Sequence, residues 1–148
     1  MKFIIANDHA AIHLKEELTG WLRAQGHECT NLGVDSDEKR VDYPDKAIEA
    51  CNLFLKGDYD LGILCCGTGI GISISANKVN GIRCSLPQNA YAAGTSRQHN
   101  NCQFIAFGGR IDYPDHPVDM LKAFIEAEYE TGGRHQNRVE KLMSIESC

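Results

Sequence analysis

The chain has no cluster of basic residues, and its formal net charge is −5 at pH 7. Proteins that bind nucleic acids by electrostatic attraction carry basic patches, so this charge balance argues against a nucleic-acid partner. No apolar run is long enough for a membrane helix, and the run that follows Met1-Lys2 is too short for a signal peptide. We therefore expect a cytoplasmic protein with no membrane partner.

Motifs for metals and cofactors are also missing. The seven cysteines contain no C-x-x-C pair, so neither a disulfide framework nor a zinc site is indicated. His9 and His13 have the spacing to share a helix face, but no glutamate follows His9 as in H-E-x-x-H zinc sites. The glycines within 67–71 do not fit the dinucleotide fingerprint, because Ile72 stands where the third glycine would be, and no phosphate-loop Gly-Lys-Ser/Thr follows. We expect no metal and no cofactor.

What the chain does contain is an alternation of short apolar runs and amphipathic segments. Its 148 residues suit a single domain, 1–148, with one sizeable core. Alternating strands and helices imply right-handed crossovers and a mainly parallel sheet, so the expected class is α/β. The predicted strands are 3–6, 27–32, 61–65, 82–84 and 104–107, and helices are expected around 14–22, 47–54, 75–78, 91–98, 118–125 and 139–143.

The segment 63–73 is the most informative, because an apolar strand ends at a cysteine and opens into a glycine-rich turn before a helix. Ligands of open α/β sheets bind beyond the carboxyl ends of the strands, where such a turn offers backbone N–H groups to an anion. The same surroundings favour a thiolate, so Cys66 is a candidate base or nucleophile. The plainer interpretation is a core cysteine beside glycines that only allow close backbone approach. Spacing alone does not decide between the two.

Two further features allow a functional and a plain interpretation. Arg134 and Arg138 are four residues apart near the start of the last helix, where two cations oppose the helix dipole and an external anion would be a favourable partner. They could equally be a solvated pair with local salt bridges. Tyr43 could face a ligand or merely pack at a helix start.

Taken together, the motifs carry a resemblance to a known family that runs nearly from end to end. They are Asp8-His9, Asp42-Tyr43-Pro44, Cys66-Gly67-Thr68-Gly69-Ile70-Gly71, Ala76-Asn77-Lys78, Ser96-Arg97-Gln98-His99-Asn100, Phe107-Gly108-Gly109-Arg110 and Gly133-Arg134-His135-Gln136-Asn137-Arg138. In them the chain resembles ribose-5-phosphate isomerase B, within the group that also holds galactose-6-phosphate isomerase subunits.

The resemblance implies a Rossmann-like three-layer α/β sandwich with a mainly parallel five-stranded sheet and an extra C-terminal helix. It also implies a homodimer or dimer of dimers whose sites are shared between subunits. The implied reaction is the metal-independent interconversion of ribose 5-phosphate and ribulose 5-phosphate, a step of carbohydrate metabolism in the pentose phosphate pathway.

The same resemblance assigns roles to residues. Cys66 matches the base, His99 the acid that opens the sugar ring, and Thr68 with the loop amides the stabiliser of the enediolate. Ile72 stands where some members have a glutamate base, which places this chain in the cysteine branch. The positions that match substrate-binding residues are Asp8, His9, Tyr43, Gly67, Gly69, Ile70, Gly71, Asn100, Arg110, Arg134 and Arg138.

The chemistry requires the same set of groups. Isomerisation of an aldose to a ketose needs a base for the proton that moves between C1 and C2, an acid for ring opening, and donors for the enediolate oxygen. Asn7 and Ala11-Ile12 depart from the family pattern beside Asp8-His9, so the sugar is less certain than the reaction. The alternatives are an isomerase of a 6-phosphohexose, such as allose or galactose 6-phosphate, and a non-catalytic nucleotide- or flavin-binding module.

Overall fold

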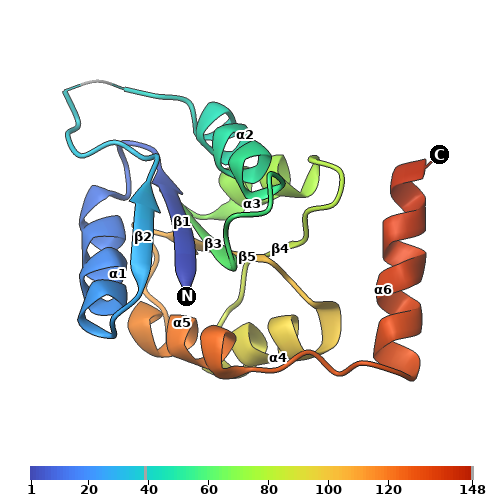
Figure 1. The fold of residues 1–148 in the computed structure, drawn as a ribbon. Coiled ribbons are helices and arrows are strands. Elements are labelled where there is room, and N and C mark those ends of the chain that lie inside the picture. The colour runs from blue at the N-terminus through green and yellow to red at the C-terminus, as the bar shows by residue number, and fades with distance from the viewer. Residues whose placement is uncertain (39, 148) are drawn as a thin grey trace.

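A five-stranded parallel sheet forms the centre of the fold (Figure 1). The computed structural model describes residues 1–38 and 40–147. The strands are β1 (Lys2–Asn7), β2 (Glu28–Asn31), β3 (Leu61–Cys66), β4 (Cys84–Ser85) and β5 (Phe104–Gly108). They lie in the order β2-β1-β3-β5-β4, and each adjacent pair is parallel. The prediction of five strands in a mainly parallel sheet is confirmed, although the strand predicted over 82–84 begins only at Cys84.

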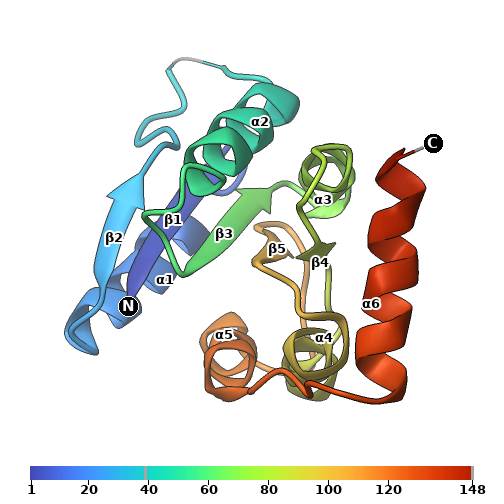
Figure 2. The ribbon, with the colours of Figure 1, turned by 45° about the vertical axis from the view of Figure 1, so that its right-hand side comes forward.

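Helices cover both faces of this sheet. They are α1 (Ile12–Ala24), α2 (Tyr43–Phe54), α3 (Ile70–Asn77), α4 (Ala90–Asn100), α5 (Pro117–Glu126) and α6 (Arg134–Ser144), with a 3₁₀ turn η1 (Ile145–Ser147) at the end. α1, α4 and α5 pack on one face, and α2 and α3 pack on the other (Figure 2). The three-layer α/β sandwich with an extra C-terminal helix is therefore confirmed. No helix in the described part of the chain has the length and apolar character needed to cross a membrane.

Alternation of side chains along the strands gives the sheet two apolar cores. Phe3 faces the core beneath α1 and α5, while its neighbour Ile4 faces the core beneath α2 and α3. Cys65 and Cys66 divide in the same way, because successive side chains of a strand point to opposite faces. Two adjacent cysteines thus have different surroundings.

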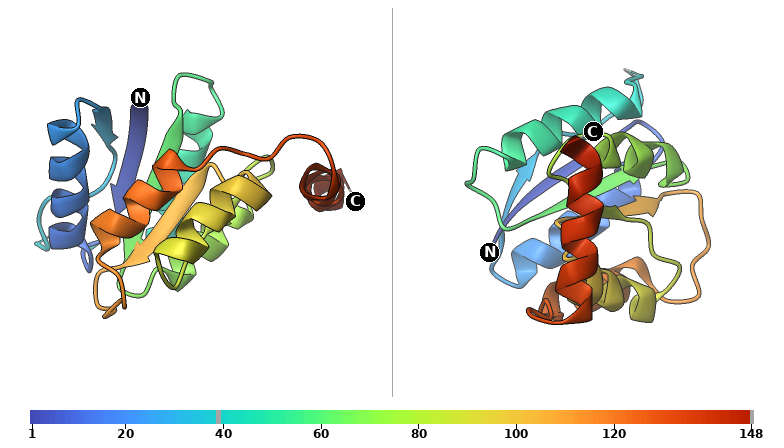
Figure 3. Two further views of the ribbon diagram at one scale, coloured as in Figure 1. Left: turned by 90° about the horizontal axis from the view of Figure 1, so that it is seen from below. Right: turned by 90° about the vertical axis from the view of Figure 1, so that its right-hand side faces the viewer.

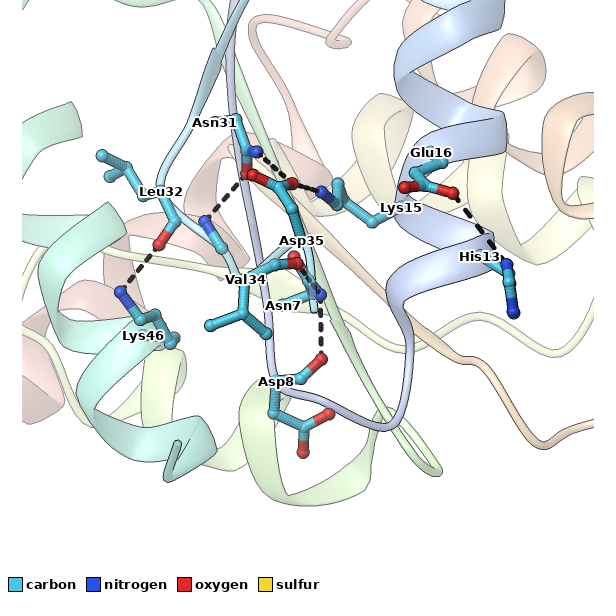
Figure 4. A network of polar contacts seen from close by, with 11 residues as sticks. Asn7, Asp8, His13, Lys15, Glu16, Asn31, Leu32, Val34, Asp35 and Lys46 are labelled. Atoms are coloured by element: carbon cyan, nitrogen blue, oxygen red, sulfur yellow. Dashed lines mark hydrogen bonds and ion pairs between the residues drawn. The ribbon is translucent and has the colours of Figure 1, made fainter. Parts of the chain in front are cut away.

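The segment 32–35 after β2 is held by polar side chains from three elements (Figure 4). Lys15 of α1 is buried and pairs with the carboxylate of Asp35, and this hydrogen bond lowers the pKa of the Asp35 carboxyl. The Asn7 amide of β1 donates to one backbone carbonyl of the segment at 3.1 Å, and Lys46 of α2 donates to another at 2.8 Å. The segment is therefore fixed beside the carboxyl end of β1.

α6 stands beside the rest of the molecule at the end of the extended segment 127–133 (Figure 3). Apart from the turn η1 that follows it directly, its contacts within the chain are chiefly with α4. Val139 is buried, but Leu142 is 44% exposed and Ile145 of the following turn is 69% exposed. The described part of the chain therefore leaves much of the apolar stripe of α6 uncovered.

Gly62 of β3 offers a test of how tightly the sheet packs against α2. A Cβ at this position would lie 2.1 Å from the ring of Phe104, which is fully buried and packs edge-on against Phe54. We expect Gly62→Ala to lower the free energy of unfolding by about 1–3 kcal/mol, because the ring has no room to move. Chemical denaturation would measure the change.

Gly20 is the matched control, since it lies on the exposed side of α1 and a Cβ there meets nothing within 4 Å. Alanine has the higher helix propensity, so Gly20→Ala should raise the free energy of unfolding by about 0.5–1 kcal/mol. A Gly62→Ala protein as stable as the parent would show that the packing under Phe104 is loose.

Candidate active site

A cleft of about 510 Å³ lies at the carboxyl edge of the sheet. Its walls come from the segments that follow β1, β3 and β5 and from the start of α2. Ligands of open α/β sheets bind at this edge. Most of the lining residues were predicted from the sequence, and Ala10 and Ile74 are additions; the full lining is Asp8, His9, Ala10, Tyr43, Cys66, Gly67, Thr68, Ile70, Gly71, Ile74 and Arg110.

Cys66 is the last residue of β3, and only 4% of it is exposed. Its Sγ accepts a hydrogen bond from the backbone N–H of Gly69 at 3.1 Å. Gly69 has a left-handed φ of 77°, and a Cβ there would lie 2.6 Å from Leu86 and 2.9 Å from the backbone of Phe107, so the position requires glycine. The turn thus directs a backbone donor at the sulfur of the cysteine that lines the cleft.

Cys65 provides the contrast. Its side chain is fully buried in the core beneath α1 and α5, as expected for the opposite face of the strand. Burial raises the pKa of the Cys65 thiol well above its usual range. Cys65 is therefore a structural thiol, and Cys66 is the cysteine of the cleft.

The turn between β3 and α3 also places Thr68 and Tyr43 on the cleft wall. Thr68 Oγ1 accepts the backbone N–H of Ile70 at 3.3 Å, at the first turn of α3, where N–H groups lack intrahelical acceptors. A Cβ at Gly71 would lie 2.5 Å from the Tyr43 ring, so the ring packs directly on this turn. Tyr43 remains 40% exposed, and it therefore both packs at its helix start and lines the cleft.

Arg110 is placed by backbone bonds between two loops. The N–H of Gly109 donates to the carbonyl of Cys66 at 2.8 Å, and the N–H of Arg110 donates to that of Gly67 at 3.0 Å. These bonds continue the pairing of β3 with β5 beyond the strands. The guanidinium of Arg110 consequently belongs to the same wall as the cysteine.

Asp8 and His9 form the wall that follows β1. Asp8 is 6% exposed, and its carboxylate accepts the backbone N–H of Ala10 at 2.9 Å. His9 Nδ1 is buried and has no hydrogen-bond partner among the described residues, which makes it an atom that a ligand could satisfy. Asn7, a departure from the family pattern, is fully buried and donates to the Asp8 carbonyl at 2.8 Å. Asn7 thus lies beneath the cleft and does not line it.

The remaining predicted residues lie elsewhere in the chain. His99 and Asn100 end α4, and Arg134 and Arg138 belong to the first half of α6. α4 runs back toward the amino end of β5, whereas Cys66 is paired with Gly108 at the carboxyl end of that strand. The five residues of β5 span about 16 Å, so a single chain holds these two groups at opposite edges of the sheet.

Near the amino end of β5, the imidazole of His99 stacks on that of His135. The ring centroids are 3.8 Å apart and the planes differ by 13°. The carboxylate of Glu130 lies 3.8 Å from His99 Nε2 and 3.4 Å from His135 Nε2. The Nε of Arg134 donates to His135 Nε2 at 3.2 Å.

These two histidines and Glu130 are the one group in the described part of the chain with enough close ligand atoms to hold a metal ion. Their geometry does not suit it. Lone pairs of ring nitrogens lie in the ring plane, so those of two nearly parallel stacked rings do not converge on one ion. Arg134 also occupies the lone pair of His135 Nε2 and adds positive charge.

Glu130 and His135 were missed from the sequence as site residues. His135 lies within the motif that contains Arg134, so its position in that motif was an available signal. Glu130 lies in an irregular segment with no local pattern, and only the packing of α4 beside α6 brings it to His99.

One cleft at the carboxyl edge of the parallel sheet brings together cysteine, threonine, aspartate, histidine and arginine side chains. This arrangement defines an α/β enzyme of small-molecule chemistry. Residues 3–142 match the family described as Ribose/Galactose Isomerase. The chain belongs to this family, and it is an isomerase.

Three known proteins show how extensive the similarity is. Ribose-5-phosphate isomerase B of Escherichia coli (strain K12) is 42% identical over 145 residues, which cover 98% of this chain and 96% of that one. D-erythrulose-4-phosphate isomerase of Pectobacterium atrosepticum is 39% identical over 142 residues, covering 96% and 93%. The structure of Clostridium thermocellum ribose-5-phosphate isomerase B superposes with a TM-score of 0.91 at 38% identity, covering 99% and 98%. The family resemblance of the motifs and the fold it implies are thus confirmed.

Proposed function

We propose that this isomerase interconverts D-ribose 5-phosphate and D-ribulose 5-phosphate through an enediolate. Membership of the family makes the chain an aldose–ketose isomerase of a sugar phosphate at the coarser level. The observation that carries the finer proposal is Cys66, which lies on a cleft of about 510 Å³ with the N–H of Gly69 directed at its sulfur.

In this proposal Cys66 is the base that moves a proton between C1 and C2 of the open-chain sugar. Negative charge then develops on the substrate oxygen, and donors that already point into the cleft stabilise it without reorganisation. In this proposal the donors are the hydroxyl of Thr68 and the amides of the turn after Cys66, apart from those of Gly69 and Ile70, which already donate to Cys66 Sγ and Thr68 Oγ1. Asp8 and His9 face the same space and would orient the sugar hydroxyls.

His99 is the proposed acid for ring opening, and we propose that it comes from a second copy of the chain. One chain holds His99 and Cys66 at opposite edges of its sheet. Exposed apolar residues beside the cleft support an interface, since Ile70 and Ile74 are 54% and 55% exposed there. A homodimer or a dimer of dimers would place Asn100, Arg134 and Arg138 of one subunit over the cleft of another.

The two arginines would then hold the substrate phosphate. Arg134 and Arg138 are one helical turn apart, so both guanidinium groups can reach the same anion. Charge-assisted hydrogen bonds to phosphate are strong, and this remote binding energy orients the reacting carbons.

Of the two alternatives from the sequence analysis, one is rejected and one stays open. A non-catalytic nucleotide- or flavin-binding module is wrong, because the chain is a member of an isomerase family. A different sugar phosphate stays open as an alternative, since relatives at 42% and 39% identity carry names with different substrates. Asn7 lies beneath the cleft wall, so its effect on the choice of sugar would be exerted through Asp8.

The substrate is tested by comparing kcat/KM on ribose 5-phosphate, allose 6-phosphate and D-erythrulose 4-phosphate. We expect kcat/KM for ribose 5-phosphate to exceed the others by about tenfold or more, because one carbon unit more or less in a fitted site usually changes kcat/KM by at least that factor. A higher value on the hexose phosphate would establish that alternative instead.

The base is tested by serine at each of the two adjacent cysteines. Cys66→Ser should lower kcat by at least about 10²-fold, because a hydroxyl is too weakly acidic to shuttle the proton. Cys65→Ser, the matched control, should keep kcat within a few-fold while lowering stability, because it buries a hydroxyl in an apolar core. Circular dichroism would verify the fold of both variants. Equal losses of activity would contradict the assignment of Cys66.

The shared site is tested by mixing two inactive variants, Cys66→Ser and Arg138→Ala, under conditions that exchange subunits. A mixed dimer then contains one site with both an intact cysteine and an intact arginine. We expect recovery of about a quarter of the parent activity from an equal mixture of randomly exchanged dimers. No recovery despite exchange proven by native mass spectrometry would place both residues of a site in one chain.

A further inference from the structure

We infer that Glu130 is a positioning residue for His99, whose ring it holds in place at the end of α4. This inference rests on the proposed function, in which His99 opens the sugar ring. Nothing in the local sequence around Glu130 indicates such a role.

Glu130 is anchored to α4 by two bonds that converge beside His99. The amide of Gln98 donates to Glu130 Oε1 at 2.7 Å, and the backbone N–H of Glu130 donates to the Gln98 carbonyl at 2.9 Å. The same Oε1 lies 3.8 Å from His99 Nε2, an ion-pair distance. The carboxylate is therefore fixed relative to the helix that carries the acid, although it belongs to the segment that leads to α6.

His135 fixes the other side of the His99 ring. It is stacked on that ring at a centroid distance of 3.8 Å, and its own side chain is 10% exposed. His135 covers one face of the ring and the carboxylate lies on its Nε2 side, so in this inference Nδ1 is the nitrogen that meets the substrate. One nitrogen toward a carboxylate and the other toward the reacting atom is the arrangement in which a histidine acts as an acid or base.

The charges and hydrogen bonds of the cluster distinguish the two rings. His135 Nε2 accepts from Arg134 Nε, so it offers no proton to Glu130. Burial, and next the charge of His99, lower the pKa of His135, while Glu130 opposes this and Arg134 and Arg138 add to it. Two stacked imidazoles do not readily carry two charges. Glu130 is the anion that lies nearest to the His99 ring among these cations, at 3.8 Å from its Nε2.

The step that this arrangement serves is the opening of the furanose. As the bond between C1 and the ring oxygen breaks, its electron pair goes to that oxygen, which takes the proton from His99. The anomeric hydroxyl becomes the carbonyl and releases its proton to water. Ribulose 5-phosphate has no furanose ring to open, so this step is needed only from the aldose side.

The test uses Glu130→Gln in the full-length oligomer, which removes the charge and keeps the shape. Glu130 is 45% exposed, so the variant should fold. We expect kcat for ribose 5-phosphate to fall at least about tenfold, while kcat for ribulose 5-phosphate changes less than about twofold. Glu128→Gln is the matched control, an exposed glutamate two residues earlier, and it should change neither value. Equal losses from both sugars would mean a merely structural role and would overturn the inference, as would no loss at all.

His99→Asn separates this inference from the proposed function. If His99 opens the ring, the rate of that variant with ribose 5-phosphate should level off as enzyme is added, because spontaneous opening becomes limiting, while its rate with ribulose 5-phosphate stays proportional to enzyme. Rates proportional to enzyme with both sugars would overturn the proposed role of His99 and the inference with it. The plateau in His99→Asn with an unchanged Glu130→Gln would overturn the inference alone.

Discussion

The hydrogen bonds that join β3 to β5 at their carboxyl ends are the interaction on which the cleft depends. They continue into the loops, where the N–H groups of Gly109 and Arg110 donate to the carbonyls of Cys66 and Gly67. The loops approach so closely that a Cβ at Gly108 would lie 2.6 Å from the backbone of Thr68. Backbone pairing thus places Cys66, Thr68 and Arg110, and the rigidity of the sheet extends into the site.

The same sheet also limits what one chain can build. In a parallel sheet each helix returns the chain from the carboxyl edge to the amino edge, so residues at the end of a helix lie opposite the strand ends. His99 ends α4 and Cys66 ends β3, and both follow this rule. A site that needs both groups must therefore draw them from two chains, which makes assembly a requirement of the proposed chemistry. α6 lies apart from the rest of the molecule and exposes apolar residues, which fits this requirement (Figure 3).

The sequence was sufficient for the elements with strong local patterns. Continuous apolar runs predicted β1, β3 and β5, because strands buried on both faces have no polar alternation. The pattern misplaced β4, where the N–H of Arg83 bonds to the side chain of Gln103 and regular pairing starts one residue later. It also placed the start of α3 too late, since the helix begins at Ile70 directly after the left-handed Gly69 and has no side-chain cap to announce it.

Some residues of the candidate site could likewise be predicted from local patterns, and others could not. The residues after β1, β3 and β5 could be grouped from the sequence, because the carboxyl ends of parallel strands meet at one edge. Motif order alone does not separate His99 from Cys66; the separation follows from the parallel-sheet rule once His99 is placed at the end of a helix and Cys66 at the end of a strand. The contacts of Glu130 with residues about thirty positions earlier depend wholly on how α4 and α6 pack, for which no periodicity gives a signal.

Positively charged side chains gather where α4 ends and α6 begins. Arg134 and Arg138 at the start of a helix repel each other and the helix dipole, and a protonated His99 would add to that repulsion. In the proposed function a substrate phosphate would relieve this repulsion, but the chain must also be stable when no substrate is bound. Glu130 supplies a negative charge there, held by a hydrogen bond from Gln98 and placed 3.8 Å from His99 Nε2. A carboxylate in direct contact with the arginines would compete with the phosphate, whereas one placed beside the histidines leaves the guanidinium groups available to it.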